Sequence, residues 1–558
     1  ENQVLLRGAF KVLARSLDLY LARALRRRRC RSGASECAVT RLGANSIVRR
    51  TLPGGQVAFW LLMFLSSLSC CRVVIVLLCG KAHAGNNGMA LTPPLTWRSW
   101  NQFGWYINED VILRAAAGLI DTQRPIKNMP VGSSLKDLGY DEVGMDEGWT
   151  ACPASPDMHG RDPNYDPRAN MPRQNVSKPF DIGNNRTSMF HRLNADGTTS
   201  PVVDELAFPD MKGLVDRIHA KGLRAGWYLN DCLSFCLSLD DGCPAEQCIP
   251  GDVKAWHEYG FDSLKIDGCS AQRDTRMWAE LINKTGTRVR LENCNNGPKP
   301  SKPIAEGGCP YYHQFRTGHD IVNSYDSWIG NAQEVAEYAT TGRHGPGCWA
   351  YPDMQMVGVQ GQTPDESTTG RYGPWDGGFV QPTITEQRTH FGLWCVLSAP
   401  ITLSIDFSNE SAVDSVWHII TNIHALAVNQ AWVGHPGTVF MQSNRSIALR
   451  ATCVQNTTCD NHGKGAKQRL TVPSWQAWYK PLPGNAAAVF VANHDAHSPA
   501  KVTIKFSDIP GLSAGELCTV TNVWKQELLV GAHTSHTEPA LAPRDSVFIT
   551  VHPRREVQ

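Results

Sequence analysis

From about residue 90 onward the chain alternates between two patterns of apolar positions. Short apolar runs that end in polar residues, such as 141–146, 223–228 and 261–267, are separated by amphipathic stretches with helical spacing. Two of these stretches, 211–221 and 253–259, end at Lys-Gly or Tyr-Gly pairs, which stop helices. Regular alternation of strand and helix predicts a parallel sheet covered by helices.

The same alternation continues towards residue 430. The apolar runs expected to be the later strands lie at 288–292, 313–317, 347–353 and 391–403. The stretch 416–429 is expected to be the closing helix. A total span of about 330 residues with insertions is typical of a (β/α)8 TIM barrel. We therefore expect a (β/α)8 catalytic domain over residues 85–436.

Two regions depart from this alternation. After about Pro436 the apolar runs are short and are separated by Gly, Pro, Asp and Asn, which predicts a C-terminal antiparallel β-sandwich domain over 437–558. These runs lie at 470–472, 487–492, 502–506 and 546–551. The stretch 152–190 is rich in Pro, Asn, Asp and Arg and has few apolar residues, so we expect a loop inserted after the second strand, on the active-site side.

The first 84 residues form a basic extension that differs from the rest of the chain. They carry 14 Lys and Arg against three acids, whereas residues 85–558 carry 40 against 49. An acidic body argues against nucleic-acid binding, because phosphates require a basic surface.

A signal peptide is predicted within this extension. Arg72, the apolar run 73–79 and the sequence Ala-His-Ala at 82–84 follow one another as a basic region, an apolar region and a cleavage site. Met63 is the first methionine of the chain. We therefore expect residues 63–84 to be a signal that is removed from the mature protein.

Residues 1–62 are then expected to be upstream sequence that is not translated. The alternative is an uncleaved signal-anchor with the arginine cluster 26–29 in the cytoplasm, and only then would a membrane be a partner. Both hypotheses send the protein into the secretory pathway, with an extracellular, lysosomal or vacuolar destination.

The cysteines and glycosylation sequons agree with that route. Of 18 cysteines, thirteen lie beyond residue 84, and an odd number leaves at least one free or paired with another chain. The run 453–459 and a cluster of four cysteines indicate local disulfide loops. The cluster consists of Cys232, Cys236, Cys243 and Cys248. Zinc is the alternative for this cluster, but no histidine stands at ligand spacing beside it, so disulfides are favoured. N-x-S/T sequons stand at Asn175, Asn185, Asn283, Asn409, Asn444 and Asn456.

Charged residues gather where the predicted strands end. Lys265 and Asp267 stand two residues apart on one apolar run, so both side chains point to the same face. A single acid at such a position most often caps the next helix. Here the arrangement repeats at other strand ends, with Asp146, Glu147, Glu292, Arg316, Asp320 and Asp353. Acids at several strand ends indicate a pocket for a neutral polyhydroxyl substrate, and glycoside hydrolysis needs one carboxylate to attack and another to protonate the leaving oxygen.

Six segments along the predicted barrel complete this picture. In order they are TPPLTWRSWN (92–101), YDEVGMDEGW (140–149), HAKGLRAGWY (219–228), LKIDGC (264–269), FRTGHD (315–320) and WAYPDM (349–354). They resemble TPPMGWNSWN, Y-x-x-V-x-x-D-D-x-W, HxKGLKxGIY, LKxDxC, WRTxxD and WNDPDM of the α-galactosidase family, glycoside hydrolase family 27. The resemblance implies a (β/α)8 barrel followed by an antiparallel β domain. Because the motifs keep their order, chance is a poor explanation.

The resemblance also implies a role for each matching residue. Asp267 would be the nucleophile and Asp320 the general acid/base of a retaining glycosidase that uses no metal or other cofactor. Trp97 would stack on the sugar. The residues expected to bind its hydroxyls are Asp146, Glu147, Tyr228, Lys265, Arg316 and Asp353. Cys269 would form a disulfide with Cys236.

Departures from the family motifs bear on the substrate. The usual second aspartate of the pair is Glu147, whose longer side chain reaches into the space for C6 and O6 of galactose. β-L-Arabinopyranose lacks that CH2OH group, and the family includes enzymes for it, so Glu147 favours a β-L-arabinopyranosidase as the alternative to an α-galactosidase. One carbon changes discrimination by about 10–200-fold, so both activities can coexist.

The fifth and seventh strands also depart from the family. The segment LENCNN (291–296) replaces the Cys-Glu-Trp that selects the 2-substituent, and either Glu292 or Asn295 takes its place. A retained acid or amide suits a free 2-hydroxyl better than an N-acetyl group, so an α-N-acetylgalactosaminidase is less favoured. Tyr351 stands where the family has Asp, which leaves Asp353 in place.

Other functional classes find less support. An inactive sugar-binding homologue would usually have lost a carboxylate, whereas a transglycosylase would keep the same residues. A serine hydrolase or nucleotide enzyme is not indicated, and the chain has no Walker A or HExxH motif. The expected partner is a galactoside or arabinopyranoside, as an oligosaccharide, polysaccharide or glycoconjugate, and we allow for a homodimer.

Overall fold

A computed structural model provides the structure of this chain. The described residues are 87–104, 106–151, 178–188, 190–229, 243–267, 274–294, 299–318, 320–361, 380–449 and 471–554. The predicted signal or anchor within residues 1–84 lies outside them.

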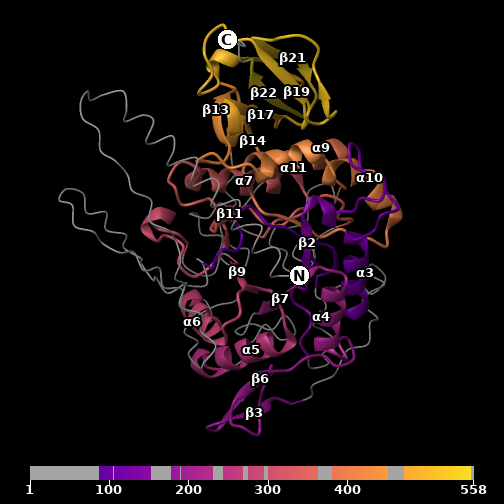
Figure 1. Ribbon diagram of the computed structural model, residues 1–558, viewed down its shortest axis with the longest axis vertical. Helices are drawn as coiled ribbons and strands as arrows, with labels where there is room; N and C mark the ends of the chain where they lie inside the picture. The colour runs from indigo at the N-terminus through magenta and orange to yellow at the C-terminus, as the bar shows by residue number, and fades with distance from the viewer. Residues whose placement is uncertain are drawn as a thin grey trace, which may run out of the picture. The chain divides into compact units, whose positions relative to one another are not determined.

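Eight parallel strands form a curled, barrel-like sheet, as the alternating pattern predicted (Figure 1). In chain order they are β1 (Leu95–Arg98), β2 (Tyr140–Gly144), β7 (Arg224–Leu229), β8 (Ser263–Ile266), β9 (Arg290–Asn293), β10 (Gln314–Arg316), β11 (Trp349–Tyr351) and β12 (Ile401–Leu403). Each strand pairs with the next in this order, and β12 pairs with β1. Between β11 and β12 the described residues show no strand ladder, but the Gln355 N–H donates to the Thr402 carbonyl at 2.8 Å. The TIM-type architecture is confirmed.

Helices lie between these strands in the chain or follow the last of them, and several begin at side-chain caps. They are α2 (Trp100–Phe103), α3 (Glu109–Leu119), α4 (Met211–Ala220), α5 (Ala245–Tyr259), α6 (Thr275–Thr285), α7 (Tyr325–Ala339), α9 (Ile384–Val396), α10 (Glu410–Ile420) and α11 (Ile423–Gln430). Short 3-10 turns lie at Lys136–Leu138, Ile304–Glu306, Pro483–Asn485 and Phe506–Asp508. Asn108, Asp210 and Ser324 each accept a backbone N–H from the first turn of α3, α4 and α7. Such caps satisfy amides that have no partner within the helix.

The prediction of a strand over 391–403 was wrong for its first half, which belongs to α9. The helix begins with a capping box, in which Thr383 and Glu386 each accept the other's backbone N–H. Nearly all of its residues are buried, because it packs against α7, α10 and α11 and against strands of the C-terminal sheet. A helix buried all round has no polar stripe, so periodicity cannot separate its apolar run from a buried strand.

The closing helix predicted at 416–429 is in fact two helices, α10 and α11. The chain turns at Thr421, and the Asn422 side chain accepts the Ala425 N–H at 3.0 Å to cap α11. An asparagine inside an apolar run was the available signal for this break.

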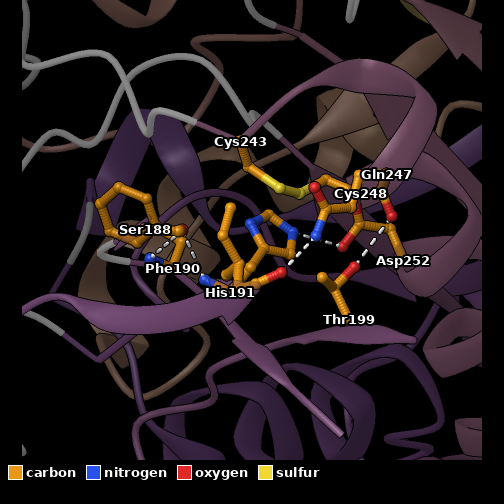
Figure 2. The surroundings of a disulfide bond; sticks show 9 residues. Ser188, Phe190, His191, Thr199, Cys243, Gln247, Cys248 and Asp252 are labelled. Carbon is orange, nitrogen blue, oxygen red and sulfur yellow. Dashed lines mark hydrogen bonds and ion pairs between the residues drawn. A yellow bond between two sulfur atoms is a disulfide. The ribbon is translucent and has the colours of Figure 1, made fainter. Parts of the chain in front are cut away.

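The end of the predicted inserted loop is regular. Strands β3 (Phe180–Gly183) and β4 (Arg186–Ser188) form one antiparallel hairpin, and β5 (His191–Leu193) and β6 (Thr199–Pro201) form a second. The prediction of a loop over 152–190 was therefore wrong for β3 and β4, whereas β5 and β6 follow the predicted loop and 152–177 lies outside the described part. Strand β6 packs along α5, which attaches the second hairpin to a barrel helix (Figure 2).

The C-terminal strands form the predicted antiparallel domain (yellow in Figure 1). Its strands are β13 (Thr438–Gln442), β14 (Ser446–Ala448), β15 (Thr471–Pro473), β16 (Trp475–Leu482), β17 (Ala486–Asn493), β18 (Ala500–Lys505), β19 (Cys518–Asn522), β20 (Glu527–Leu528), β21 (Ser535–Leu541) and β22 (Ser546–Pro553). Six of them pair in the order β13-β16-β17-β22-β19-β20, while β18 pairs with β21 and β14 with β15.

The two faces of this six-stranded sheet belong to different cores. Phe490 on β17 packs in the large core that also contains the barrel, whereas its neighbours Val489 and Val491 pack in a second core with Val502 of β18. Successive strand residues point to opposite faces, so β17 serves both cores. Among the described helices none combines the length and apolar character needed to cross a membrane.

Candidate active site

The C-terminal ends of neighbouring barrel strands gather most of the predicted site residues. Asp146 and Glu147 follow β2, Tyr228 is on β7, Lys265 and Asp267 are on and after β8, Arg316 and Asp320 are on and after β10, and Asp353 follows β11. Because the strands are parallel, these positions lie at one end of the barrel. It is the end that carries the active site in this fold.

Asp267 lies beside a tyrosine and a second acid. The Tyr228 hydroxyl is 3.0 Å from Asp267 Oδ2 and 3.3 Å from Glu147 Oε2. Its single proton serves one acceptor at a time, and the shorter contact favours Asp267. Burial, together with the charges of Asp267 and Glu147, raises the pKa of Tyr228, so the hydroxyl remains a donor. Both carboxylates are only partly buried and so remain accessible.

Lys265 brings a positive charge to this group. Its Nζ is 2.8 Å from Asp146 Oδ2, and both side chains are buried. Burial opposes the charge on Lys265, but Asp146 and, more weakly, Asp267 raise its pKa. Arg98 on β1 adds a second cation, with Nε 4.0 Å from Asp146. Asp146 is therefore held between two cations, and Lys265 remains charged near Asp267.

Arg316 joins two acids. Its Nη1 is 2.6 Å from Asp320 Oδ1 and 3.3 Å from Asp353 Oδ2. Asp353 also accepts the backbone N–H groups of Ile321 at 2.9 Å and Met354 at 2.7 Å. Burial and the neighbouring Asp320 raise the pKa of Asp353, while Arg316 acts in the opposite direction. The guanidinium favours the charged form of Asp320, which suits a base better than an acid.

Glu292 lies inside the barrel, 2% exposed, with both oxygens engaged by protein groups. Its Oε2 accepts from Arg98 at 2.8 Å and from Gln314 at 2.6 Å, and its Oε1 accepts from the Tyr351 hydroxyl. Burial opposes the charge, yet Arg98 holds the pKa of Glu292 below its usual value. Of the two candidates for the 2-substituent, this arrangement favours Asn295, which lies outside the described residues.

Arg98 and Tyr351 form a network with Glu292 that sequence reasoning missed. Arg98 stands where the family motif has Asn, Tyr351 where it has Asp, and Glu292 belongs to the replaced segment of the fifth strand. All three departures meet in one hydrogen-bonded cluster. The departures were visible in the sequence, but the contact between β1, β9 and β11 was visible only in the fold.

Trp97 is 1% exposed on β1. Its indole N–H donates to the Ile405 carbonyl at 2.8 Å, and its ring centroid is 6.1 Å from that of Phe103. Its stacking on a sugar stays a prediction.

The described cysteines form two disulfides. Cys243–Cys248 joins two members of the predicted cluster, and Cys309–Cys348 was not foreseen. The predicted pair Cys236 and Cys269 lies outside the described residues. Among those described, Cys294 is a free thiol next to the site, and burial raises its pKa.

The opposite end of the barrel holds another set of charges. Arg290, at the start of β9, pairs with Glu142, and both side chains are buried. Arg224, at the start of β7, is 2.7 Å from Asp141, and this pair is partly exposed. Burial and the nearby charge of Arg224 lower the pKa of Arg290. A cavity of about 790 Å³ is lined by Asp141, Arg224, Arg290 and the segment 88–95.

Two family models match this chain. One, described as alpha galactosidase A, covers residues 189–375, and the other, alpha galactosidase C-terminal beta sandwich domain, covers 473–551. An α-galactosidase of Cyamopsis tetragonoloba is 25% identical over 453 residues, which are 80% of this chain and 82% of that protein. An α-galactosidase of Oryza sativa subsp. japonica is 25% identical over 481 residues, which are 85% of this chain and 88% of that protein.

Solved structures share the fold over a similar span. α-Galactosidase I from Mortierella vinacea matches with a TM-score of 0.55 and 21% identity, covering 84% of this chain and 98% of that one. A β-L-arabinopyranosidase from Geobacillus stearothermophilus, solved with arabinose, matches with a TM-score of 0.57 and 17% identity, covering 84% and 98%. An α-galactosidase from Saccharomyces cerevisiae, solved with raffinose, matches with a TM-score of 0.56 and 15% identity, covering 84% and 99%.

Proposed function

The chain belongs to the α-galactosidase family, glycoside hydrolase family 27, and from that membership we propose that it hydrolyses terminal α-D-galactosyl residues with retention of configuration. One observation carries the mechanism: Asp267 and Asp320 follow β8 and β10 at the same end of the barrel, with a tyrosine hydroxyl 3.0 Å from Asp267. Two carboxylates flanking a glycosidic bond can share attack and proton donation.

In the proposed first step Asp267 attacks the anomeric carbon, and Asp320 gives a proton to the leaving oxygen. Lys265 supports the ionised form of Asp267, because its charge lies close by and it remains protonated. The Tyr228 hydroxyl donates a hydrogen bond to Oδ2 of Asp267 and so helps to orient the carboxylate. The product of this step is a covalent glycosyl-enzyme ester.

In the proposed second step Asp320 takes a proton from water, and the resulting hydroxide displaces Asp267. Arg316 supports this step, because its contact with Asp320 favours the carboxylate. The first step needs a protonated Asp320, so that contact must weaken when the sugar binds. A contact between Arg316 and O2 of the sugar, the role that the family resemblance implies, would draw the guanidinium away.

We propose an α-D-galactoside as the preferred substrate. The plant relatives are α-galactosidases, and one structural neighbour was solved with raffinose. Glu147 is the residue that tests this choice, because its carboxylate lies 3.3 Å from the Tyr228 hydroxyl beside the proposed nucleophile. A dominant β-L-arabinopyranosidase activity would overturn the substrate assignment and leave the mechanism intact.

Kinetics on para-nitrophenyl α-D-galactopyranoside and β-L-arabinopyranoside test substrate and mechanism together. Asp267→Asn is expected to lower kcat by at least about 10³-fold. Azide should restore turnover of this variant as a glycosyl azide, and nuclear magnetic resonance of the first wild-type product should show retention. Asp141→Asn, at the other end of the barrel, is the matched control and should keep wild-type kcat. Inversion, or near-normal turnover by Asp267→Asn, would contradict the proposal.

We also propose passage through the secretory pathway. The described sequons at Asn185, Asn283, Asn409 and Asn444 are all exposed, which suits glycosylation. Digestion with an N-glycosidase should lower the mass of the protein from its native host, and the mature chain should begin near Gly85. An unglycosylated protein that retains residues 63–84 would contradict this route.

A further inference from the structure

A lysine from the connection between β9 and β10 reaches the end of β10, where the chain continues towards Asp320. The Lys299 Nζ donates to the Thr317 backbone carbonyl at 2.8 Å. Thr317 directly follows β10, and Asp320 comes three residues later. The segments that resemble the family include Thr317 and Asp320 but not Lys299, so the resemblance implies no role for this lysine.

On the basis of the proposed acid/base role of Asp320, we propose that Lys299 is a positioning residue for that acid. It holds the chain at Thr317 so that Asp320 lies where it can protonate the leaving oxygen. Lys299 touches neither the sugar nor the transferred proton, and it acts through the backbone alone.

Thr317 is a well-fixed point from which the chain leads to the acid. Its N–H and its hydroxyl both donate to the Tyr351 carbonyl on β11, at 2.9 and 3.2 Å, and its own carbonyl accepts from Lys299. Thr317 is only 1% exposed, so water has little access to these bonds. A buried backbone carbonyl needs a partner, and Lys299 supplies one at the point where β10 ends.

The residues on either side of Thr317 carry this restraint towards the acid. A Cβ on Gly318 would lie 3.0 Å from Asn331 Cγ, so the chain packs closely against α7 there. On the other side of Thr317, Arg316 Nη1 is 2.6 Å from Asp320 Oδ1. A shift of about 1 Å in a catalytic group can lower the rate by about 10²-fold, so a loose Thr317 should weaken acid catalysis.

The charge of Lys299 strengthens its bond to the carbonyl. Burial lowers the pKa of Lys299 to about 8, with Arg316 acting in the same direction and Glu334 and Glu337 of α7 in the opposite one. Lys299 therefore remains protonated at neutral and acidic pH. A neutral amide could bond the Thr317 carbonyl without placing a cation near Arg316, but a charged donor forms a bond about twice as strong.

The dependence of the rate on the leaving group tests this positioning role. A dinitrophenolate departs without a proton, whereas the leaving sugar of raffinose needs one, and kcat/KM reports the first step for both. Lys299→Met should lower kcat/KM on raffinose by about 10–100-fold and on a dinitrophenyl α-D-galactoside by less than about 3-fold. The ratio of the two values does not depend on stability, because both substrates report on the same folded molecules.

Matched variants identify the cause. Lys299→Arg keeps a charged donor and should recover most of the lost activity on raffinose. Lys302→Met, at an exposed lysine three residues away, is the control and should keep wild-type values on both substrates. Equal losses on both substrates in Lys299→Met, or a higher KM for raffinose at unchanged kcat, would overturn the proposal.

Asp320→Asn separates failure of the positioning role from failure of the proposed mechanism. This variant should show the same preference for the dinitrophenyl substrate, and more strongly. If it shows no such preference, Asp320 is not the acid. If it does and Lys299→Met does not, the positioning role of Lys299 alone is wrong.

Discussion

The two ends of the barrel both carry clusters of acids and bases, but they hold their acids differently. At the N-terminal end Glu142 stands within β2, in register with Arg224, and one of its oxygens is engaged by Arg290 and Ser263. At the C-terminal end Asp267 and Asp320 come after the last residue of a strand and remain partly exposed. An acid within a strand is fixed by its neighbours, whereas an acid past the strand end can meet a ligand.

The position of the cavity supports the same distinction. The cavity of about 790 Å³ opens at the N-terminal end, away from the proposed catalytic acids. A hollow lined by charges therefore does not identify catalysis, whereas the direction of the strands does, because active sites lie at the C-terminal ends in this fold. Substitutions at one end should change the chemistry, and substitutions at the other should change stability.

Asp320→Asn is expected to give the largest difference between loss of activity and loss of stability. Loss of the proton donor should lower kcat/KM on raffinose by about 10²–10⁴-fold. The urea midpoint of unfolding should stay near that of wild type, because Asp320 is partly exposed. Wild-type turnover of raffinose would remove Asp320 from the chemistry.

Glu142→Gln should have the converse effect. It leaves the buried guanidinium of Arg290 without a carboxylate, which typically costs about 3–5 kcal/mol. Urea unfolding measures that loss, and the remaining folded enzyme should keep its kcat. If kcat falls while stability is unchanged, the distinction between the two ends fails.

Lys480 tests whether a buried lysine needs an acid beside it to stay protonated. Lys265 has Asp146, whereas Lys480 on β16 donates to the carbonyls of Val428 and Asn429 at the end of α11. Burial lowers the pKa of Lys480 to about 7, from 10.5 in an unfolded chain. Between these values the unfolded chain binds the extra proton, so stability should rise with pH by up to about 1.4 kcal/mol per unit.

Lys480→Met should remove that rise, which thermal unfolding at several pH values can measure. Wild type and variant should then differ most in slope between neutral and alkaline pH. An equal slope in both proteins would show that another group is responsible.

Glu147→Asp tests how two neighbouring acids at the C-terminal end of the barrel, Glu147 and Asp146, differ in their effect on the choice of sugar. The shorter side chain should shift the ratio of kcat/KM towards the galactoside over the arabinopyranoside by about 10–200-fold. Asp146, next in the chain but tied to Lys265, should not tolerate a matching change without loss of both activities. An unmoved ratio would show that Glu147 does not border C6 of the sugar.

The smallest effect is expected from Asp141→Asn. Its pair with Arg224 is partly exposed, so its loss should cost at most about 1 kcal/mol and less in high salt. Unfolding in low and high salt measures both quantities. A loss as large as that of Glu142→Gln would mean that solvent exposure does not determine how much each ion pair at this end stabilises the fold.

The order of the strands and the acids at their ends could be predicted from the sequence, because apolar runs and motifs are local signals. The helical state of residues 391–396 in α9 could not be predicted, because a helix that is buried on all sides shows no periodic polar pattern. Glu292 was identified as a site residue, but its engagement by Arg98 and Tyr351 depends on side chains from three strands. His191 beside Cys248 was missed for the same reason: proximity in space leaves no trace in spacing along one chain.

The cluster of Arg98, Glu292 and Tyr351 restricts how this sequence can have diverged. Asn in place of Arg98 alone would leave the buried carboxylate of Glu292 without its guanidinium, and Asp in place of Tyr351 alone would set a second acid beside it. Each single reversion towards the family motif should therefore be harmful, although a combined replacement need not be. The three positions form an epistatic unit, and ancestral reconstruction should find that they changed together or through a neutral residue at position 292.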